Sequence, residues 1–236
     1  MNFQFPKMAN TVRTKPGTET TTTETNPLDS MQSFYETNKK RINTISTVLL
    51  VGAAAIFGYY KFVKGPKEAK AANAIAFAQT LFQTDSLNQA LNGDGQHMGF
   101  LQIIKKYGGT DAGNLANYYA GVSYLQMNDP KTAIKYLKDF DAHGTTVKYM
   151  AYGALGDAYM ESGNTKEAIE YYNKAAGEKD NSLITPMYLY RAALAYEMNN
   201  QPEKATDAYK RIRDEYPQSQ QARETDKNLA RLGIVE

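Results

Sequence analysis

The second half of the chain repeats one pattern of small, aromatic and bulky positions. A small residue is followed by Tyr three positions later, by Ala nine positions after that, and by a bulky residue four further on. This pattern predicts pairs of antiparallel helices that approach closely where Gly or Ala on one helix faces Ala on the other, with large side chains filling the space beside them. The three instances are Gly121/Tyr124/Ala133/Leu137, Gly156/Tyr159/Ala168/Tyr172 and Ala193/Tyr196/Ala205/Tyr209.

Turn signals separate the two predicted helices of each unit. Asp129 before Pro130 is typical of a helix N-cap followed by Pro at the first helical position. The repeated Tyr positions lie 35 and 37 residues apart, close to the roughly 34 residues of a tetratricopeptide unit. Residues 114–217, which end at Tyr216-Pro217, therefore resemble three tetratricopeptide repeats, and the resemblance implies a scaffold for binding rather than catalysis. The turns of the second and third units are Ser162-Gly163-Asn164-Thr165 and Asn199-Asn200-Gln201-Pro202.

Weaker helical patterns flank these three units. We expect Gly65-Pro66 to break the preceding helix, after which apolar residues recur at helical spacing up to Phe82. The stretch from Leu87 to Gly99 is loop-like, and a short helix from Phe100 ends at Gly108. These elements predict a degenerate first repeat, and residues 220–232 predict a polar capping helix. The expected fold is an all-α solenoid over residues 66–236, with about three clear repeats.

One segment has the length and composition of a membrane-spanning helix. From Ile42 to Tyr60 there are 19 residues without a charge, which as a helix extend about 28 Å, close to the hydrocarbon thickness of a bilayer. Basic residues stand at both ends and aromatic residues at one, as at membrane interfaces. We therefore predict a single transmembrane helix over residues 42–63. The predicted anchor residues are Lys39, Lys40, Arg41, Gly52, Gly58, Tyr59, Tyr60 and Lys61.

The anchor hypothesis has two alternatives, a buried core helix and a cleaved signal peptide ending near Ala53-Ala54-Ala55. Charge on both flanks disfavours the first, and the long polar leader disfavours the second. Within that leader, residues 29–41 predict a juxtamembrane amphipathic helix. Residues 1–28 are Thr-rich, with Thr at 8 of 15 positions from Thr11 to Thr25, and predict a disordered tail because they cannot bury enough apolar surface.

Charge distribution disfavours nucleic acid as a partner. Residues 1–64 contain 8 Lys/Arg and 4 Asp/Glu, whereas residues 65–236 contain 19 and 21. The repeat region is therefore nearly neutral, without the basic excess of a nucleic-acid-binding domain. Basic residues around the anchor are too evenly divided to decide its orientation. Since an uncleaved anchor near the amino end usually leaves a short tail inside the cell, we expect residues 1–41 in the cytoplasm and the repeats outside.

Catalytic and metal-binding patterns are missing from the sequence. There is no cysteine, no G-x-S-x-G, no phosphate-binding Gly loop and no H-E-x-x-H. His97 and His143 have no partner at ligand spacing, and the spacing of Asp85, Asn92 and Asp94 does not match a calcium loop. We therefore expect a protein without enzymatic activity, catalytic residues, metal or cofactor.

The predicted binding surface is a groove lined by the first helix of each unit. By resemblance to the tetratricopeptide pattern, the second, fifth, ninth, twelfth and thirteenth positions of that helix face the groove. Met and Tyr are frequent there, which suits adaptable contact with apolar segments. The alternative is that several of these side chains pack against the degenerate first repeat or the final helix instead. The positions are Leu115, Tyr118, Val122, Leu125 and Gln126, then Met150, Gly153, Asp157, Met160 and Glu161, and then Met187, Tyr190, Leu194, Glu197 and Met198.

The order of these segments resembles that of the YfgM family, ancillary subunits of the bacterial SecYEG translocon. An amphipathic segment from Phe34, one anchor ending in Tyr59-Tyr60, an Ala-rich helix at 69–78 and a tetratricopeptide domain follow one another as in that family. The resemblance implies a single-pass inner-membrane protein with periplasmic repeats, whose partners are the translocon, a PpiD-like periplasmic chaperone and nascent or secreted polypeptides. Two rival hypotheses are an adaptor in cell-envelope or outer-membrane assembly and a receptor whose repeats face the cytoplasm.

Overall fold

The computed structural model describes residues 27–144, 147–177 and 181–234, and all elements in these ranges are helices. The predicted all-α fold is confirmed. The chain divides into two compact units, residues 1–56 and 57–236, which are described separately. Residues 1–26, which contain nearly all of the predicted disordered tail, lie outside the described residues.

The described part of the first unit lies in one helix, α1 (Pro27–Tyr59), whose last three residues belong to the second unit. Both the predicted juxtamembrane segment and most of the predicted span lie within it. The large apolar side chains of α1 are exposed, for example Leu50 at 71% and Phe57 at 65%. The Thr44 and Thr47 hydroxyls donate to the carbonyls of Lys40 and Asn43. These hydroxyls are therefore satisfied inside the helix, as a polar group in an apolar environment must be.

The second unit begins with a π-helical turn, η1 (Tyr60–Lys64), followed directly by α2 (Gly65–Gln83). The expected helix break at Gly65-Pro66 is wrong. Pro66 lies in the first turn of α2. The Gly65 N–H donates to the Tyr60 carbonyl, five residues back, and this wider turn lets the backbone stay helical up to the proline. One helical run, Ser30–Gln83, is long and apolar enough to cross a membrane by length and composition alone.

Two short helices complete the amino-terminal part of this unit. The expected loop from Leu87 to Gly99 is partly wrong, because its first six residues form α3 (Leu87–Asn92), whose Ala90 and Leu91 are buried. The expected turn follows, with Gly93 and Gly95 at φ of 86° and 90°, values open to glycine without strain. The next helix, α4 (Phe100–Tyr107), ends at Gly108 as predicted.

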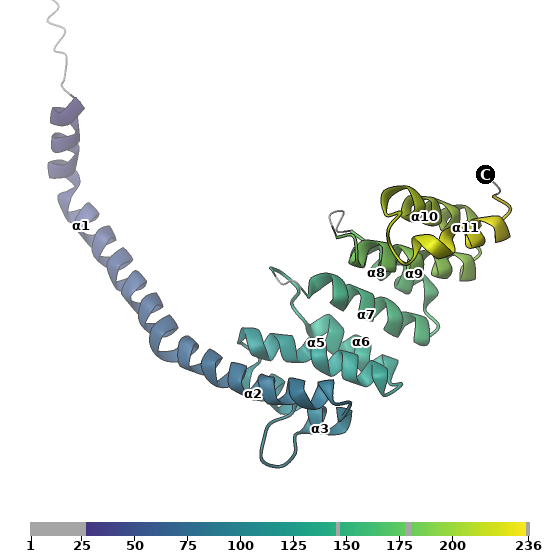
Figure 1. Cartoon of the computed structure of the whole chain (residues 1–236). Coiled ribbons are helices and arrows are strands. Elements are labelled where there is room, and N and C mark those ends of the chain that lie inside the picture. Colours follow the sequence, from purple (N-terminus) through teal and green to yellow (C-terminus); the bar gives the residue numbers. More distant parts are fainter. Residues whose placement is uncertain (1–26, 145–146, 178–180, 235–236) are drawn as a thin grey trace, which may run out of the picture. The chain divides into compact units, whose positions relative to one another are not determined.

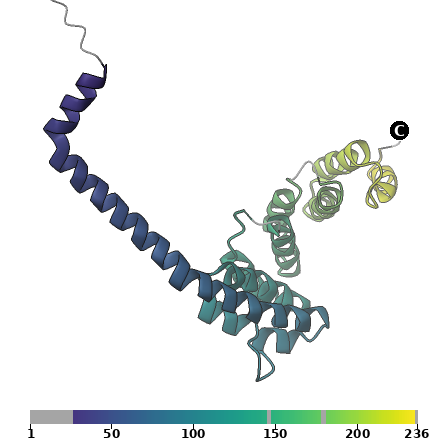
Figure 2. The same cartoon turned by 60° about the vertical axis from the view of Figure 1, so that its left-hand side comes forward.

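Three helix pairs and a final helix follow, and consecutive helices pack side by side (Figures 1 and 2). Each pair turns through one residue with positive φ, namely Asn128, Gly163 or Asn200. Asp129 caps the second helix of the first pair by accepting a hydrogen bond from the Thr132 N–H at 3.1 Å. The predicted turn signals are therefore confirmed. The helices are α5 (Asp111–Gln126) and α6 (Pro130–Asp139), α7 (Lys148–Glu161) and α8 (Thr165–Ala175), α9 (Ile184–Met198) and α10 (Pro202–Glu215), and α11 (Ala222–Arg231).

The repeated small residues are the contact points within each pair. A Cβ added to Gly121 would lie 2.5 Å from the Leu137 side chain, and one added to Gly156 would lie 2.4 Å from the Tyr172 ring. In the third pair Ala193 and Tyr209 are both fully buried. Gly is required in the first two pairs because even a Cβ would clash with the facing side chain there, and the third pair has room for the Ala side chain.

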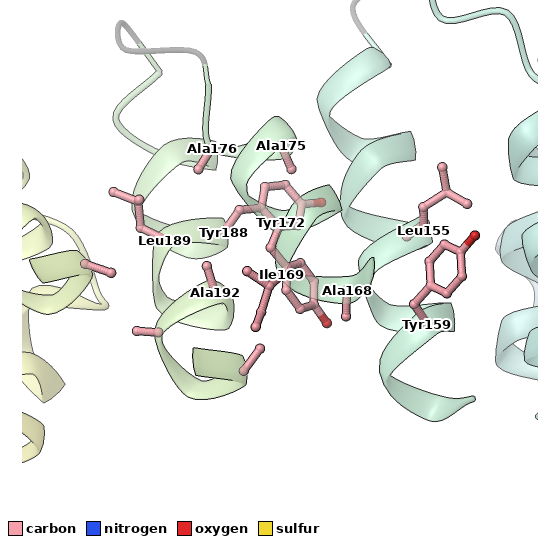
Figure 3. Close-up of a cluster of buried hydrophobic side chains, with 14 of the residues drawn as sticks. Leu155, Tyr159, Ala168, Ile169, Tyr172, Ala175, Ala176, Tyr188, Leu189 and Ala192 are labelled. Atoms are coloured by element: carbon pink, nitrogen blue, oxygen red, sulfur yellow. The ribbon is translucent and has the colours of Figure 1, made fainter. Parts of the chain in front are cut away.

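Two hydrophobic clusters fill the interior of the second unit. One belongs to α2–α5 and includes Ile75, Leu91, Phe100 and Ile103. The other runs from α5 to α11 and is rich in Ala and Tyr. Figure 3 shows its centre, where Ala168, Ile169 and Tyr172 of α8 lie between α7 and α9.

Candidate protein-binding groove

The predicted groove positions lie on α5, α7 and α9, the first helices of the three pairs. α5 contacts α7, and α7 contacts α9, so these helices form a continuous row that we call the first-helix face. Met150 and Leu194 are exposed on it, at 47% and 39%, and Met198 is exposed at 67%. Six others are half-buried against the cluster of α5–α11: Leu115, Val122, Leu125, Met160, Met187 and Tyr190.

Tyr118 is a predicted groove residue that the structure shows to be buried. Its exposed fraction is 9%, and its ring lies 5.3 Å from Tyr119 and 5.8 Å from Phe140 between ring centroids. Burial raises the pKa of the Tyr118 hydroxyl to about 12. Tyr118 is therefore a packing residue beneath the first-helix face and offers little surface to a partner.

Asp157, another predicted groove residue, joins two repeats. Its carboxylate pairs with the Arg191 guanidinium on α9 and accepts a 2.7 Å hydrogen bond from the Tyr172 hydroxyl on α8. The Arg191 guanidinium also lies 5.7 Å from the Tyr188 ring centroid, a favourable cation–π distance. Burial, with the adjacent Asp157 charge, raises the pKa of Tyr172, so its hydroxyl stays a donor at neutral pH.

Glu197 repeats this arrangement one unit later. Its carboxylate pairs with Arg231 on α11 through N···O distances of 2.6 and 2.9 Å, and it accepts a 2.8 Å hydrogen bond from the Tyr209 hydroxyl on α10. Burial alone raises the pKa of Glu197, but the hydrogen bonds from Arg231 and Tyr209 outweigh it, so the pKa lies below its ordinary value. Asp157 and Glu197 are therefore partly occupied by contacts within the protein.

Both ion pairs join residues 34 positions apart, which is one tetratricopeptide period. We call the two pairs, with their Tyr hydroxyls, the charged ladder. It connects α7 to α9 and α9 to α11. The α5 helix carries a single charged residue, Asp111, in its first turn. Its Tyr118 and Val122 pack in the same hydrophobic cluster as residues of α7.

A cavity of about 680 Å³ opens where α5 begins. One wall is the face of α2 that presents Glu68, Ala72, Ile75 and Gln79, and the opposite wall is the first turn of α5. The described part of the α6–α7 connection closes the third side with Phe140, Asp141, His143, Gly144 and Val147. Leu115, a predicted groove residue, also lines this cavity, so the cavity is continuous with the first-helix face.

Two polar contacts hold the walls of this cavity in place. The Glu68 carboxylate accepts hydrogen bonds from the N–H groups of Asp111 and Ala112 at 2.9 and 3.0 Å, which caps α5 from another helix. The Asn114 side chain and the Asp141 backbone exchange two hydrogen bonds, each 2.8 Å long. These hydrogen bonds thus fix the relative positions of the segments that line the cavity.

The histidines occupy separate loops, as predicted. The His97 ring stacks on Phe77 with centroids 3.8 Å apart and contacts the Asp94 carboxylate at 3.0 Å. Backbone and side-chain hydrogen bonds from His97 lower the pKa of Asp94 to about 2. His143 contacts Asp141 at 2.7 Å and is almost fully exposed. Within residues 27–144, 147–177 and 181–234, His, Cys, Asp and Glu form no group of three that could hold a metal ion.

The predicted anchor residues lie in α1 and η1. Lys39, Lys40, Arg41, Tyr59, Tyr60 and Lys61 are exposed. The Lys61 ammonium lies 5.7 Å from the Phe57 ring centroid, and a Cβ added to Gly52 or Gly58 would meet no atom within 4 Å. Among the described residues, these glycines therefore have no packing partner.

Comparison with known proteins agrees with this architecture. A family model described as "Tetratricopeptide repeat" matches residues 118–182 and 155–220. This segment therefore matches the tetratricopeptide repeat pattern, which is typical of scaffolds for protein–protein interaction, and no enzyme family is indicated. No curated protein matches the sequence.

Two solved structures share the fold at low sequence identity. The crystal structure of MamA is 18% identical, with a TM-score of 0.53, over 66% of this chain and 85% of that chain. A variant with TPR-like repeats, from a Podosopora anserina protein described as a kinesin light chain, is 14% identical, with a TM-score of 0.54, over 70% of this chain and 85% of that chain. Each likeness shows the fold alone, and both agree with an α-solenoid.

Sequence reasoning missed several residues that organise this surface. Arg191 and Arg231 were not singled out, although each stands one repeat period after an acidic residue, and a search for opposite charges at that separation finds both. Glu68 and Asp111 were also missed. Their contact joins residues 43 positions apart, outside any repeat period, and it follows only from the packing of α2 on α5.

Proposed function

We propose that the protein is a single-pass membrane protein whose α1 helix holds a tetratricopeptide scaffold at a bilayer, where the first-helix face binds segments of other proteins. The observation that carries this proposal is the pairing of an uncovered apolar helix with a repeat domain of the protein-binding class. The scaffold acts by holding its partners and has no chemical step.

The exposed surface of α1 supports the membrane part of the proposal. Each large apolar side chain left in water forgoes about 1.5–3 kcal/mol relative to burial. A bilayer removes this penalty, and the satisfied hydroxyls of Thr44 and Thr47 suit that environment. The basic and aromatic residues at the ends of the apolar stretch then lie at the two interfaces. The large exposed side chains are Ile45, Val48, Leu49, Leu50, Val51, Ile56 and Phe57.

The exposed apolar residues of the first-helix face support the binding part. Met150, Leu194 and Met198 stand clear of the core and offer adaptable contacts. Such contacts are weak one by one. Anchoring in the membrane raises the effective concentration of the repeats near a partner in the same membrane, so weak contacts are sufficient for binding.

The partners that we propose follow from the resemblance of residues 31–236 to the YfgM family. In this proposal the first 41 residues lie in the cytoplasm, and the repeats lie in the periplasm beside the SecYEG translocon. There they bind a PpiD-like chaperone or emerging polypeptides.

Site-specific photo-crosslinking in membranes tests the binding surface. A photoreactive residue is placed at Met150 or at Leu194, with exposed Lys166 on α8 and exposed Glu203 on α10 as matched controls. We expect crosslinks to a translocon or chaperone subunit from the two first-helix positions and none from the controls. Equal crosslinking from all four positions, or none from any, would contradict the proposal.

Membrane placement needs a separate measurement. We expect alkaline carbonate to leave the chain in the membrane pellet, and external protease to digest the repeats only after the outer membrane is opened. Release by carbonate contradicts the anchor. Digestion of the amino-terminal tail in place of the repeats contradicts the proposed orientation and favours a cytoplasm-facing receptor.

A further inference from the structure

We propose that the cavity between α2, the start of α5 and the described part of the α6–α7 connection is a specificity pocket for a basic side chain of a partner polypeptide, a Lys or Arg next to an apolar residue. This inference rests on the proposed function, because it names which segments the scaffold selects. We call this cavity the acidic pocket.

The volume and the apolar lining of the acidic pocket suit a long side chain with an apolar stem. Its volume of about 680 Å³ falls in the roughly 300–1,000 Å³ range of ligand-binding sites. Ala72, Ile75, Leu115 and Phe140 supply apolar lining. Lys and Arg pack their methylene stems on such surfaces while their charged ends stay at a polar rim.

The charges at the rim favour a cation over an anion. Among the residues that the structure describes, the lining contains three carboxylates, Glu68, Asp111 and Asp141, and no Lys or Arg. Asp111 and Asp141 are exposed at the rim. The Glu68 carboxylate is fixed in place by its two backbone hydrogen bonds. His143, the remaining titratable residue of the lining, is paired with Asp141, whose pKa the hydrogen bonds from His143 hold below its ordinary value, so Asp141 stays charged at neutral pH.

The position of the pocket favours a polypeptide as the source of the cation. Leu115 belongs both to the pocket and to the first-helix face. Val147, at the other side of the pocket, directly precedes α7. A chain lying along the face can therefore place one side chain in the pocket while its neighbours contact the apolar residues of α7 and α9.

The test uses the full-length protein in nanodiscs and fluorescence anisotropy with three short peptides. The peptides share one Leu-containing sequence and differ at a single central position, which is Lys, Gln or Glu. We expect the Lys peptide to bind most tightly and the Glu peptide most weakly. We also expect Asp111→Asn to weaken the Lys peptide about five-fold, to leave the Gln peptide unchanged, and to reduce the salt dependence of Lys-peptide binding.

Two further variants make the test specific. Asp226→Asn removes the same charge from an exposed position of α11 and should change no peptide affinity. Ala72→Trp fills the pocket and should weaken the Lys and Gln peptides alike, while Ala230→Trp, on exposed α11 surface, should not. Circular dichroism of each variant separates loss of binding from loss of fold.

The outcomes distinguish this inference from the proposed function. If the Gln and Glu peptides bind as tightly as the Lys peptide, or if Asp111→Asn and Asp226→Asn have equal effects, the acidic pocket is not a site for basic side chains, while the scaffold function stands. If none of the three peptides binds, both the inference and the peptide-binding function are wrong.

Discussion

The helices at the two ends of the second unit are held together by different kinds of interaction. At the amino end, α2–α5 pack through aliphatic and aromatic side chains, with the Phe100 ring stacked 5.3 Å from Tyr119. At the carboxyl end, α7–α11 add the charged ladder to an Ala- and Tyr-rich core. The difference teaches that α7, α9 and α11 are connected by polar contacts one period apart, whereas α2–α5 depend on apolar packing and on the Glu68 cap of α5.

The largest effect is expected at the centre of the amino-terminal cluster. Phe100 is fully buried, so Phe100→Ala should destabilise the protein by about 3–5 kcal/mol. Since each repeat of an array contacts only its neighbours, the damage should stay local. Hydrogen exchange should show lost protection in α2–α5 and retained protection in α9–α11.

A matched control for Phe100→Ala is Phe62→Ala, because Phe62 is exposed at 73%. The repeat domain of the Phe62→Ala variant should keep its full protection from hydrogen exchange. If Phe100→Ala also removes protection from α9–α11, the two ends form one cooperative body and the comparison fails.

A smaller effect is expected where two helices of one repeat touch. Gly156→Val places side-chain atoms against the Tyr172 ring, where even a Cβ comes within 2.4 Å. Such overpacking typically costs about 1–3 kcal/mol. The variant should lower the urea midpoint of the repeats. Gly52→Val should leave it unchanged, because a Cβ added at Gly52 meets no atom within 4 Å. Equal effects would show that the small residues of the repeat are not packing positions.

The repeat pattern made the carboxyl-terminal half predictable from the sequence. Gly121, Gly156 and Ala193 mark close helix contacts, and Asp129 and Pro130 mark a helix start, because these depend on residues near in sequence or one period apart. The Leu87–Gly99 segment was harder. Polar Asn88 and Gln89 obscure the burial of Ala90 and Leu91, which depends on contacts with helices elsewhere in the chain.

The candidate site was less predictable for the same physical reason. The family pattern placed Met150 and Leu194 on an exposed face, but it also selected Tyr118, which the ring of Phe140 covers. A helix position predicts the direction of a side chain and not what lies over it. The acidic pocket depends on Glu68 reaching α5 and on Asn114 holding Asp141. Both are contacts between distant segments with no sequence period.

The cap on α5 should give the next effect in size. Glu68→Ala removes both acceptors from the Asp111 and Ala112 N–H groups, and loss of a helix cap costs about 0.5–2 kcal/mol. Glu68→Gln keeps one acceptor oxygen and should retain part of this stability. Thermal unfolding of the two variants in the same detergent checks the order. A Glu68→Ala protein as stable as the original would show that α2 is held on α5 by apolar contacts alone.

The smallest effect, and the one that isolates the charged ladder, is the acid sensitivity of Glu197. Because its pKa is lowered in the folded state relative to the ordinary value of 4.5, the unfolded chain binds a proton first as the pH falls. The stability from the Glu197–Arg231 pair is therefore complete above about pH 4.5 and is lost as the pH drops through the lower folded-state pKa. Arg231 is 55% exposed, so solvent screening keeps the contribution of the pair small.

Glu197→Gln should therefore reduce stability slightly at pH 7 and flatten the fall in unfolding free energy below pH 4.5, the ordinary pKa of this carboxyl group. Urea unfolding across this range measures both effects. Glu170→Gln is the matched control, since its exposed pair with Lys174 lies within the single helix α8 and joins no repeats. If the two variants show the same acid profile, the ladder adds nothing beyond an ordinary surface pair. If only Glu197→Gln flattens the profile, the Glu197–Arg231 pair adds stability between α9 and α11. Such an ion pair between residues one period apart then distinguishes the carboxyl-terminal helices from α2–α5.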